Sequence, residues 1–209
     1  MKKAFIFDLD GVLVSTDRYH YAAWKSIADE EGIYFDETIN NRLRGVSRRE
    51  SLKIILERAP RTYGEEEEHA LAEKKNERYR ASLENLTPAD RLAGVSETLE
   101  ALRRTGALLA VGSSSKNARY ILGKIGYGDY FDAVVDGNDI VNGKPDPEVF
   151  LKAAALLHLS PCDCYVVEDA KTGIDAAVRG GFCAVGIHDA ACYDRADHAI
   201  KAFSDLLGL

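Results

Sequence analysis

The sequence predicts an α/β protein: a doubly wound parallel sheet with a small α-helical cap domain inserted after the first strand. Short apolar segments alternate with helical patterns from residue 88 onward, which is typical of parallel sheets with helices on both faces. Residues 17–87 show almost only helical periodicity. An apolar segment at residues 4–7 precedes them and belongs with the later strands. We therefore predict a core of residues 1–14 and 88–209 and a cap of residues 15–87.

The first predicted strand, Ala4–Phe7, is short and apolar and is followed at once by acidic residues. In the cap, apolar residues recur at helical spacing over residues 21–28. A second helix is expected after Ser47, because Ser47 and Glu50 form a capping-box pattern. The acidic run at residues 65–68 is expected to open another helix, since negative charge is favourable in a first turn.

The core repeats strand and helix in alternation. Buried strands are expected at residues 107–111, 133–135, 165–167 and 183–187. Helical spacing of apolar residues predicts helices between them. Pro147 is expected at the first position of one of these helices, where its missing N–H costs nothing.

Composition and charge exclude several classes of protein. The chain has 209 residues, 46% of them hydrophobic and 29% charged, which excludes a disordered or collagen-like protein. Its formal net charge of −7 argues against nucleic acid or an anionic membrane as a partner. No apolar run approaches the roughly 18 residues of a membrane span, and the acidic residues that soon follow Met1 do not suit a signal peptide. We expect a cytoplasmic protein.

Polar side chains follow several of the predicted strands. In open α/β sheets, ligands bind at the carboxyl ends of the strands. Each motif alone has a structural alternative, because it could be only a turn, a loop or a helix cap. Together they predict one site at one edge of the sheet. The residues are Asp8 and Asp10; Ser113, Ser114, Ser115, Lys116 and Asn117; Lys144; and Glu168 and Asp169.

These residue types suit phosphoryl transfer. Clustered carboxylates repel one another unless a divalent cation binds, and a hard cation with oxygen ligands indicates Mg²⁺. A lysine with hydroxyl and N–H donors can hold a phosphoryl group. Asp8 can then attack phosphorus as a nucleophile. Asp10, two residues along an extended segment, can face the same site and transfer the proton.

The segment Phe5-Ile6-Phe7-Asp8-Leu9-Asp10-Gly11-Val12-Leu13 resembles the first motif of the haloacid dehalogenase (HAD) superfamily. Ser113, Lys144 and the pair Glu168-Asp169 are similar to its second, third and fourth motifs, in order and spacing. The resemblance covers the whole chain. It implies an HAD-like Rossmannoid core with a helical cap, and a phosphotransferase or phosphatase whose first aspartate is the nucleophile.

Further segments resemble the β-phosphoglucomutase family within that superfamily. They are Thr16–Trp24, Gly45-Val46-Ser47-Arg48, Lys75-Asn76, Thr87-Pro88-Ala89-Asp90 and Ser113–Asn117. The resemblance implies conversion of β-D-glucose 1-phosphate to glucose 6-phosphate through β-glucose 1,6-bisphosphate. Two alternatives stay open: a sugar-phosphate phosphatase of the same fold, and a non-catalytic phosphosugar-binding module.

The resemblance also implies a role for each matching residue. Ser113 and Lys144 would hold the transferring phosphoryl group, and His20, Thr16 and Lys75 would couple cap closure to Asp10. The implied catalytic residues are Asp8, Asp10, His20, Lys75, Ser113 and Lys144. The implied substrate-binding residues are Thr16, Trp24, Gly45, Val46, Arg48, Ser115, Lys116 and Asn117. The implied Mg²⁺ ligands are Asp8, Asp10 (through its carbonyl), Glu168 and Asp169. The partners expected are small-molecule sugar phosphates, and a monomer would suffice. Ser114 departs from the family, where alanine is expected.

Overall fold

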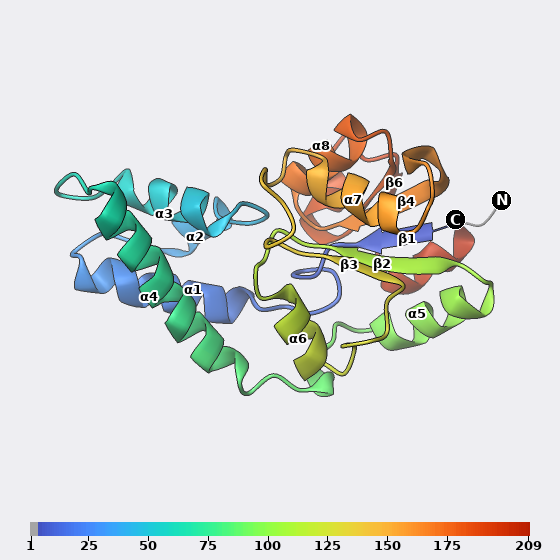
Figure 1. The fold of residues 1–209 in the computed structure, drawn as a ribbon, viewed down its shortest axis with the longest axis horizontal. Coiled ribbons are helices and arrows are strands. Elements are labelled where there is room, and N and C mark those ends of the chain that lie inside the picture. Colours follow the sequence, from blue (N-terminus) through green and yellow to red (C-terminus); the bar gives the residue numbers. More distant parts are fainter. Residues whose placement is uncertain (1–3) are drawn as a thin grey trace. The chain divides into compact units, whose positions relative to one another are not determined.

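The computed structural model describes residues 4–209, and the chain divides into two compact units (Figure 1). One unit comprises the chain up to Ser15 together with Leu86–Leu209, and the other is Thr16–Asn85. The predicted cap, residues 15–87, differs from the second unit by one residue at its start and two at its end. We call the two units the core and the helical unit.

The core contains a parallel sheet, as predicted. Within residues 4–209 it has six strands in the order β3-β2-β1-β4-β5-β6, so the chain winds outward from β1 in both directions. This arrangement confirms the doubly wound fold class. The edge strand β6 was not predicted, because it is only two residues long and exposed. The strands are β1 (Ala4–Phe7), β2 (Leu108–Gly112), β3 (Ala133–Val135), β4 (Cys164–Glu168), β5 (Cys183–Gly186) and β6 (His198–Ala199).

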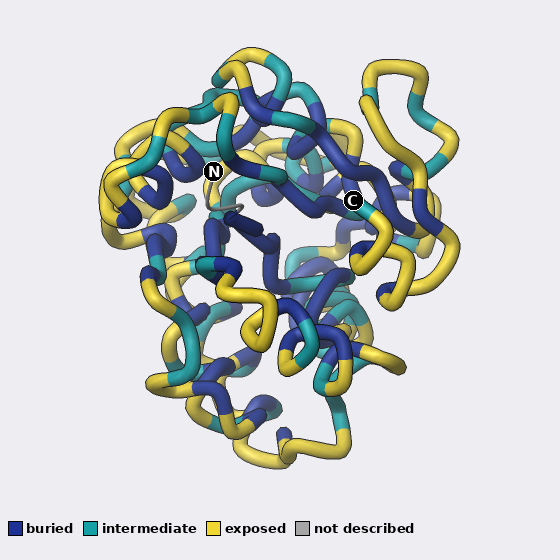
Figure 2. Tube along the Cα trace, turned by 90° about the vertical axis from the view of Figure 1, so that its right-hand side faces the viewer, coloured by how far each residue is buried: buried dark blue, intermediate teal, exposed yellow. Residues whose placement is uncertain are grey.

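The register of the sheet determines which residues meet at its carboxyl edge. β1 lies between β2 and β4, and Phe7 pairs with Val111 on one side and Val167 on the other. The residues that follow the carboxyl ends of β1, β2 and β4 therefore lie next to one another. The strands β1, β2 and β4 are buried along almost their whole length (Figure 2).

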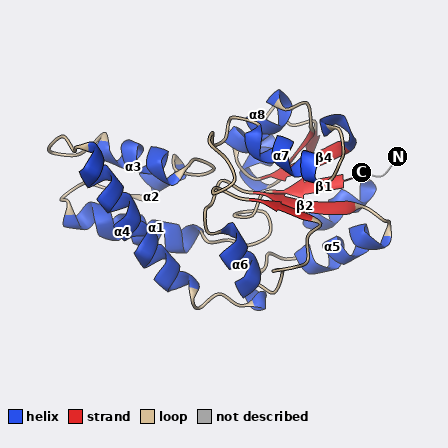
Figure 3. Ribbon diagram, viewed as in Figure 1, coloured by secondary structure: helices blue, strands red, loops and turns tan. Residues whose placement is uncertain are grey.

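Helices cover both faces of the sheet (Figure 3). α5 (Val95–Arg104) and α6 (Ala118–Lys124) lie on one face, and α7 (Glu148–Leu156) and α8 (Lys171–Arg179) lie on the other. Phe150 of α7 and Ile174 of α8 pack with Ile6 and Val166 in a fully buried cluster. Pro147 is the N-cap of α7 and not its first helical residue, so the prediction was one position out. Short 3₁₀ helices occur at Pro88–Asp90, Pro161–Asp163, His188–Cys192 and Phe203–Gly208.

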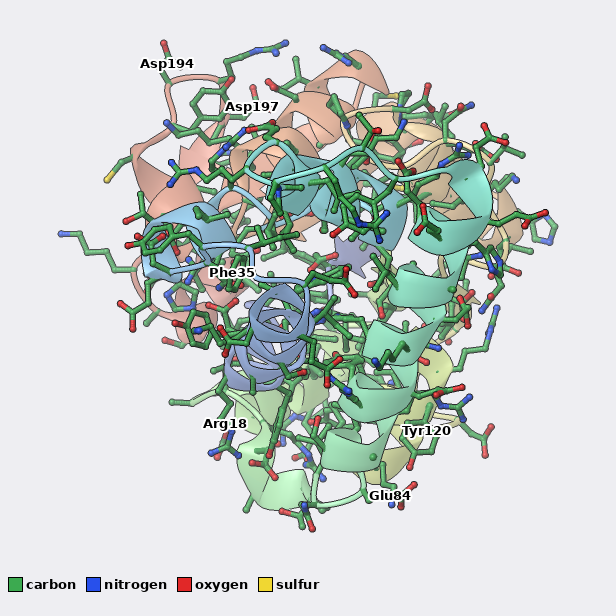
Figure 4. The ribbon with its side chains drawn as sticks, turned by 90° about the vertical axis from the view of Figure 1, so that its left-hand side faces the viewer. Arg18, Phe35, Glu84, Tyr120, Asp194 and Asp197 are labelled. Carbon is green, nitrogen blue, oxygen red and sulfur yellow. The ribbon has the colours of Figure 1, made fainter. Side chains whose placement is uncertain are left out.

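The helical unit consists of α1 (Asp17–Glu30), α2 (Glu37–Asn41), α3 (Arg48–Leu56) and α4 (Glu65–Leu83). Its own apolar cluster includes Trp24, Ile27, Leu52 and Phe35, the last of which is labelled in Figure 4. The ring centroids of Phe35 and Tyr21 are 5.6 Å apart. α3 begins with the predicted capping box, and α4 begins with the predicted acidic turn. No helix within residues 4–209 is long and apolar enough to cross a membrane.

Candidate active site

The carboxyl edge of the sheet brings together four of the charged residues predicted there, Asp8, Lys144, Glu168 and Asp169. Asp8 directly follows β1, and Ser113 directly follows β2. Glu168 is the last residue of β4, and Asp169 is the next. Lys144 comes from the segment between β3 and α7. Because β1, β2, β3 and β4 are parallel neighbours, their ends supply one site.

A buried lysine joins two carboxylates at the centre of this edge. The Lys144 Nζ atom donates a hydrogen bond to Asp8 Oδ1 at 2.5 Å and another to Glu168. Lys144 and Glu168 are each only 1% exposed. Burial by itself would lower the pKa of the Lys144 ammonium, but the charges of Asp8 and Glu168 outweigh burial and raise it. Lys144 therefore stays cationic and holds Asp8 in place.

Negative charge exceeds positive charge around Lys144. Asp8, Glu168 and Asp169 each offer an oxygen atom, and these atoms lie within 4.8 Å of one another. Burial raises the pKa of Asp169 to about 9, and the charges of Glu168, Asp8 and Asp10 add to this. Burial also raises the pKa of Glu168 to about 7, against the effect of Lys144. A cluster of oxygen donors in which a carboxylate resists ionisation fits a hard divalent cation.

Two glycines make room for this cluster. Gly11 has a φ of +83°, and a Cβ atom there would stand 2.1 Å from Asp169 Oδ2. A Cβ atom on Gly173, in the first turn of α8, would stand 1.9 Å from the Glu168 Cδ atom. Sequence reasoning missed both as functional residues. A glycine inside a helical pattern, as at Gly173, was the available signal.

The segment after β2 forms a tightly folded loop. Ser113 Oγ accepts the backbone N–H of Ser115, and Ser115 Oγ accepts the backbone N–H of Asn117. Ser113 and Asn117 are buried, whereas Lys116 is exposed. Ser114 Oγ is buried and has no hydrogen-bond partner within residues 4–209. The loop thus presents hydroxyl and amide groups at the same edge as Asp8.

The helical unit holds a second polar cluster. Lys75 of α4 is 2% exposed, lies over the rings of Trp24 and Tyr79, and donates a hydrogen bond to His20 Nδ1 at 2.8 Å. Burial and then the charge of Lys75 lower the pKa of His20 well below its usual value, so the neutral ring accepts this bond. Thr16 Oγ1 is 2.8 Å from the Tyr79 hydroxyl.

The burial of Trp24 and Thr16 changes the expectation for these two residues. Both were predicted to bind substrate, yet Trp24 is 2% exposed and Thr16 is fully buried. Trp24 belongs to the apolar cluster of the helical unit, and the Lys75 ammonium group lies over its ring, 4.9 Å from the ring centroid. Because Trp24 and Thr16 are buried, they are better placed to position the His20–Lys75 pair than to contact a ligand.

Gly45, Val46 and Arg48 lie at and before the start of α3. Gly45 has a φ of +73°, a conformation that favours glycine, and it turns the chain into α3. Arg48 is the first residue of α3, and its Nη1 atom is 2.6 Å from Glu73 Oε1 of α4. The Arg48 side chain is 20% exposed.

Comparison with known proteins identifies relatives that act on phosphorylated sugars. A family model described as haloacid dehalogenase-like hydrolase matches residues 2–181. A β-phosphoglucomutase of Bacillus subtilis is 43% identical over 206 residues, which cover 98% of this chain and 91% of the relative. A phosphorylated carbohydrates phosphatase of Thermotoga maritima is 32% identical over 181 residues, covering 86% and 82%. The crystal structure of a β-phosphoglucomutase from Clostridium difficile matches with a TM-score of 0.92 and 37% identity, covering 99% of this chain and 93% of that one.

Proposed function

The chain belongs to the haloacid dehalogenase-like hydrolase family, and on that premise we propose that it interconverts β-D-glucose 1-phosphate and glucose 6-phosphate. One observation carries the phosphoryl-transfer chemistry: Asp8 is held by the buried Lys144 beside Glu168 and Asp169. The 43% identity to the Bacillus subtilis β-phosphoglucomutase over 98% of the chain supports the choice of a mutase and of glucose.

The proposed reaction starts with Asp8 as an aspartyl-phosphate and consists of two phosphoryl transfers, the second of which regenerates that aspartyl-phosphate. In the first, Asp10 takes the proton of the 6-hydroxyl of β-glucose 1-phosphate. The 6-oxygen attacks the phosphorus on Asp8 and the Asp8–phosphate bond breaks, giving β-glucose 1,6-bisphosphate. After the bisphosphate turns round, Asp8 attacks the 1-phosphate. The bond between phosphorus and the sugar oxygen breaks, Asp10 returns the proton to that oxygen, and glucose 6-phosphate leaves.

Mg²⁺ is the cation we propose for the acidic cluster. Asp8, Asp169 and the Asp10 carbonyl would hold it, with Glu168 close by, and the raised pKa of Asp169 supports a cation there. When bound, Mg²⁺ supplies positive charge to a dianionic phosphoryl group and lowers its repulsion from Asp8. Ser113 and Lys144 supply the remaining donors to the transferring group.

A mutase must bind a second phosphate as well. We propose that Arg48, Ser115, Lys116 and Asn117 bind this phosphate or the sugar, and that Gly45 and Val46 contact the sugar through their backbone. Arginine suits this role because its planar guanidinium binds phosphate through two parallel hydrogen bonds. His20 and Lys75, supported by Thr16 and Trp24, would act on the proton transfer of Asp10. All these residues come from one chain, so a monomer suffices, and charged sugar phosphates make the cytoplasm the expected site of action.

The alternative is a sugar-phosphate phosphatase of the same fold, which the 32% identity to the Thermotoga maritima phosphatase favours. The two activities differ only in whether sugar or water accepts the phosphoryl group from Asp8. The products therefore distinguish them.

The test is incubation of the purified protein with β-glucose 1-phosphate, Mg²⁺ and a trace of β-glucose 1,6-bisphosphate. We expect glucose 6-phosphate, measured with a coupled dehydrogenase, and little inorganic phosphate. The α-anomer serves as the matched substrate control and should not be converted. Removal of divalent ions with EDTA should abolish activity, and Mg²⁺ should restore it. Release of inorganic phosphate at the rate of substrate loss would favour the phosphatase instead.

A further inference from the structure

The segment that carries Lys144 is held mainly by polar contacts. It runs from β3, which ends at Val135, to α7, which begins at Glu148. Val141 is 89% exposed and Asn142 is exposed, so apolar packing does not fix the chain just before Lys144. Lys144 itself is nevertheless buried and lies 2.5 Å from Asp8. Besides its own ion pairs with Asp8 and Glu168, polar contacts of the neighbouring backbone position Lys144.

Glu148 makes such contacts on both sides of Lys144, in addition to the hydrogen bond from Arg179 Nη1 to the Pro145 carbonyl at 3.2 Å. On the first side, its carboxylate accepts the backbone N–H of Asn142 at 2.8 Å and that of Val141 at 3.1 Å. On the second side, its own backbone N–H donates to Asp146 Oδ1 at 2.9 Å. Residues 142 and 146 are thus both tied to the first residue of α7, and Lys144 lies midway between them.

A lysine one turn along α7 keeps the carboxylate in place. Lys152 Nζ donates to Glu148 Oε1 and to the Asp139 carbonyl, each at 2.6 Å. The hydrogen bond from Lys152, followed by those from Asn142 and Val141, lowers the pKa of Glu148 to about 2. Glu148 is therefore charged at neutral pH, and charged acceptors form the stronger hydrogen bonds.

We propose that Glu148 is a positioning residue for phosphoryl transfer: it fixes the 142–146 segment and thereby the place of the Lys144 ammonium relative to Asp8. The inference rests on the proposed function for its effect on catalysis, but the contacts it invokes are independent of the substrate. A displacement of about 1 Å at a group that stabilises the transition state can cost on the order of 100-fold in rate. We therefore expect the loss to fall on kcat more than on KM.

The experiment compares Glu148→Ala and Glu148→Gln with Asp205→Ala. Asp205 is a matched control, because its carboxylate also accepts two backbone N–H groups, those of Lys201 and Ala202, at the start of a 3₁₀ helix elsewhere in the core. We expect Glu148→Ala to lower kcat by about 10- to 100-fold with KM little changed. Glu148→Gln should recover part of the rate, because its amide oxygen still accepts a hydrogen bond. Asp205→Ala should keep the kcat of the unmodified chain.

A second readout separates this inference from the proposed function. Amide hydrogen exchange at Val141 and Asn142 should become faster in Glu148→Ala, and the NMR signal of the Lys144 ammonium should shift, with neither change in Asp205→Ala. If the unmodified chain does not convert β-glucose 1-phosphate, the proposed function is wrong, while these signals still test the contacts. Unchanged exchange and an unchanged Lys144 signal in Glu148→Ala, or an unchanged kcat in an active enzyme, would overturn the inference.

Discussion

Asp8, Glu168 and Asp169 are three carboxylates of similar chemistry in different surroundings. Asp8 and Glu168 both accept a hydrogen bond from the ammonium group of Lys144. Burial and acidic neighbours instead raise the pKa of Asp169. Of the two carboxylates that Lys144 holds, Asp8 is the one that follows β1, in the interior of the sheet. Its position and charge make Asp8 the nucleophile in the proposed reaction.

Replacement of Asp8 by asparagine tests this assignment. An amide of the same shape does not attack phosphorus, so we expect Asp8→Asn to lower turnover by at least about 10⁴-fold. Intact-mass spectrometry should find the phosphorylated form in the unmodified chain and not in the variant. Turnover near that of the unmodified chain would contradict the assignment.

Ser114 gives a prediction about stability. Its buried hydroxyl has no hydrogen-bond partner within residues 4–209, and a buried polar group without a partner costs about 1–3 kcal/mol. Ser114→Ala, which introduces the residue expected at this position from the family resemblance, should raise the free energy of unfolding by about 1 kcal/mol, measured by urea denaturation.

The neighbouring Ser115→Ala is the matched control for that measurement. Ser115 Oγ accepts the N–H of Asn117, so its removal should lower the free energy of unfolding. A decrease for Ser114→Ala as well would show that the Ser114 hydroxyl has a favourable partner in solution.

Among the elements, α4 shows how a strongly polar helix is held in a folded unit. Its buried residues, Leu71, Lys75, Tyr79 and Leu83, recur every four residues and form one narrow stripe. Most of its other residues are charged, and Lys74 and Arg78 form ion pairs with Glu30 of α1. A helix of this kind depends on its partner more than on its own hydrophobic face.

The ion pairs between α1 and α4 predict a pH dependence. Hydrogen bonds from Arg78 and then Lys74 lower the pKa of Glu30 from 4.5 to about 2. A lowered pKa in the folded state stabilises the protein above pH 4.5, and this contribution disappears as the pH falls towards 2. We expect Glu30→Gln to reduce the loss of stability between pH 5 and pH 3, measured by urea denaturation.

Glu100→Gln on α5 is the control for Glu30→Gln. Glu100 is exposed and forms no ion pair within the described residues. The control should keep the acid dependence of the unmodified chain. An identical acid dependence in both variants would contradict a stabilising role for the Glu30 ion pairs.

At the scale of the whole molecule, the chain passes between its two units twice, near residues 15–16 and 85–86. The residues proposed for the phosphoryl group lie in the core, and Arg48 lies in the helical unit. Core residues alone could serve a phosphatase. A mutase needs a second phosphate position, and the proposed role of Arg48 there would distinguish the two activities.

We expect Arg48→Ala to lower the conversion of β-glucose 1-phosphate by about 10- to 100-fold, the value of one charged hydrogen-bonded contact. Hydrolysis of a small ester such as phenyl phosphate, which has no second phosphate, should change much less. Arg49→Ala is the control, because Arg49 is the adjacent exposed arginine. Equal losses on both substrates would contradict the role of Arg48.

The sequence by itself determined the elements and the residue types of the site. Apolar spacing and the capping box placed the major strands and helices to within a few residues, because these signals depend on neighbours along the chain. The motif residues at strand ends indicated phosphoryl transfer for a different reason, because parallel strands bring their carboxyl ends to one edge.

Only the tertiary structure decided distances between residues remote in sequence. Lys144 lies 136 residues from Asp8, and their contact depends on the register of β1 between β2 and β4 and on the Glu148 contacts. The need for glycine at position 173 likewise follows from where Glu168 lies. Local periodicity contains no information on such approaches, because packing between elements sets them.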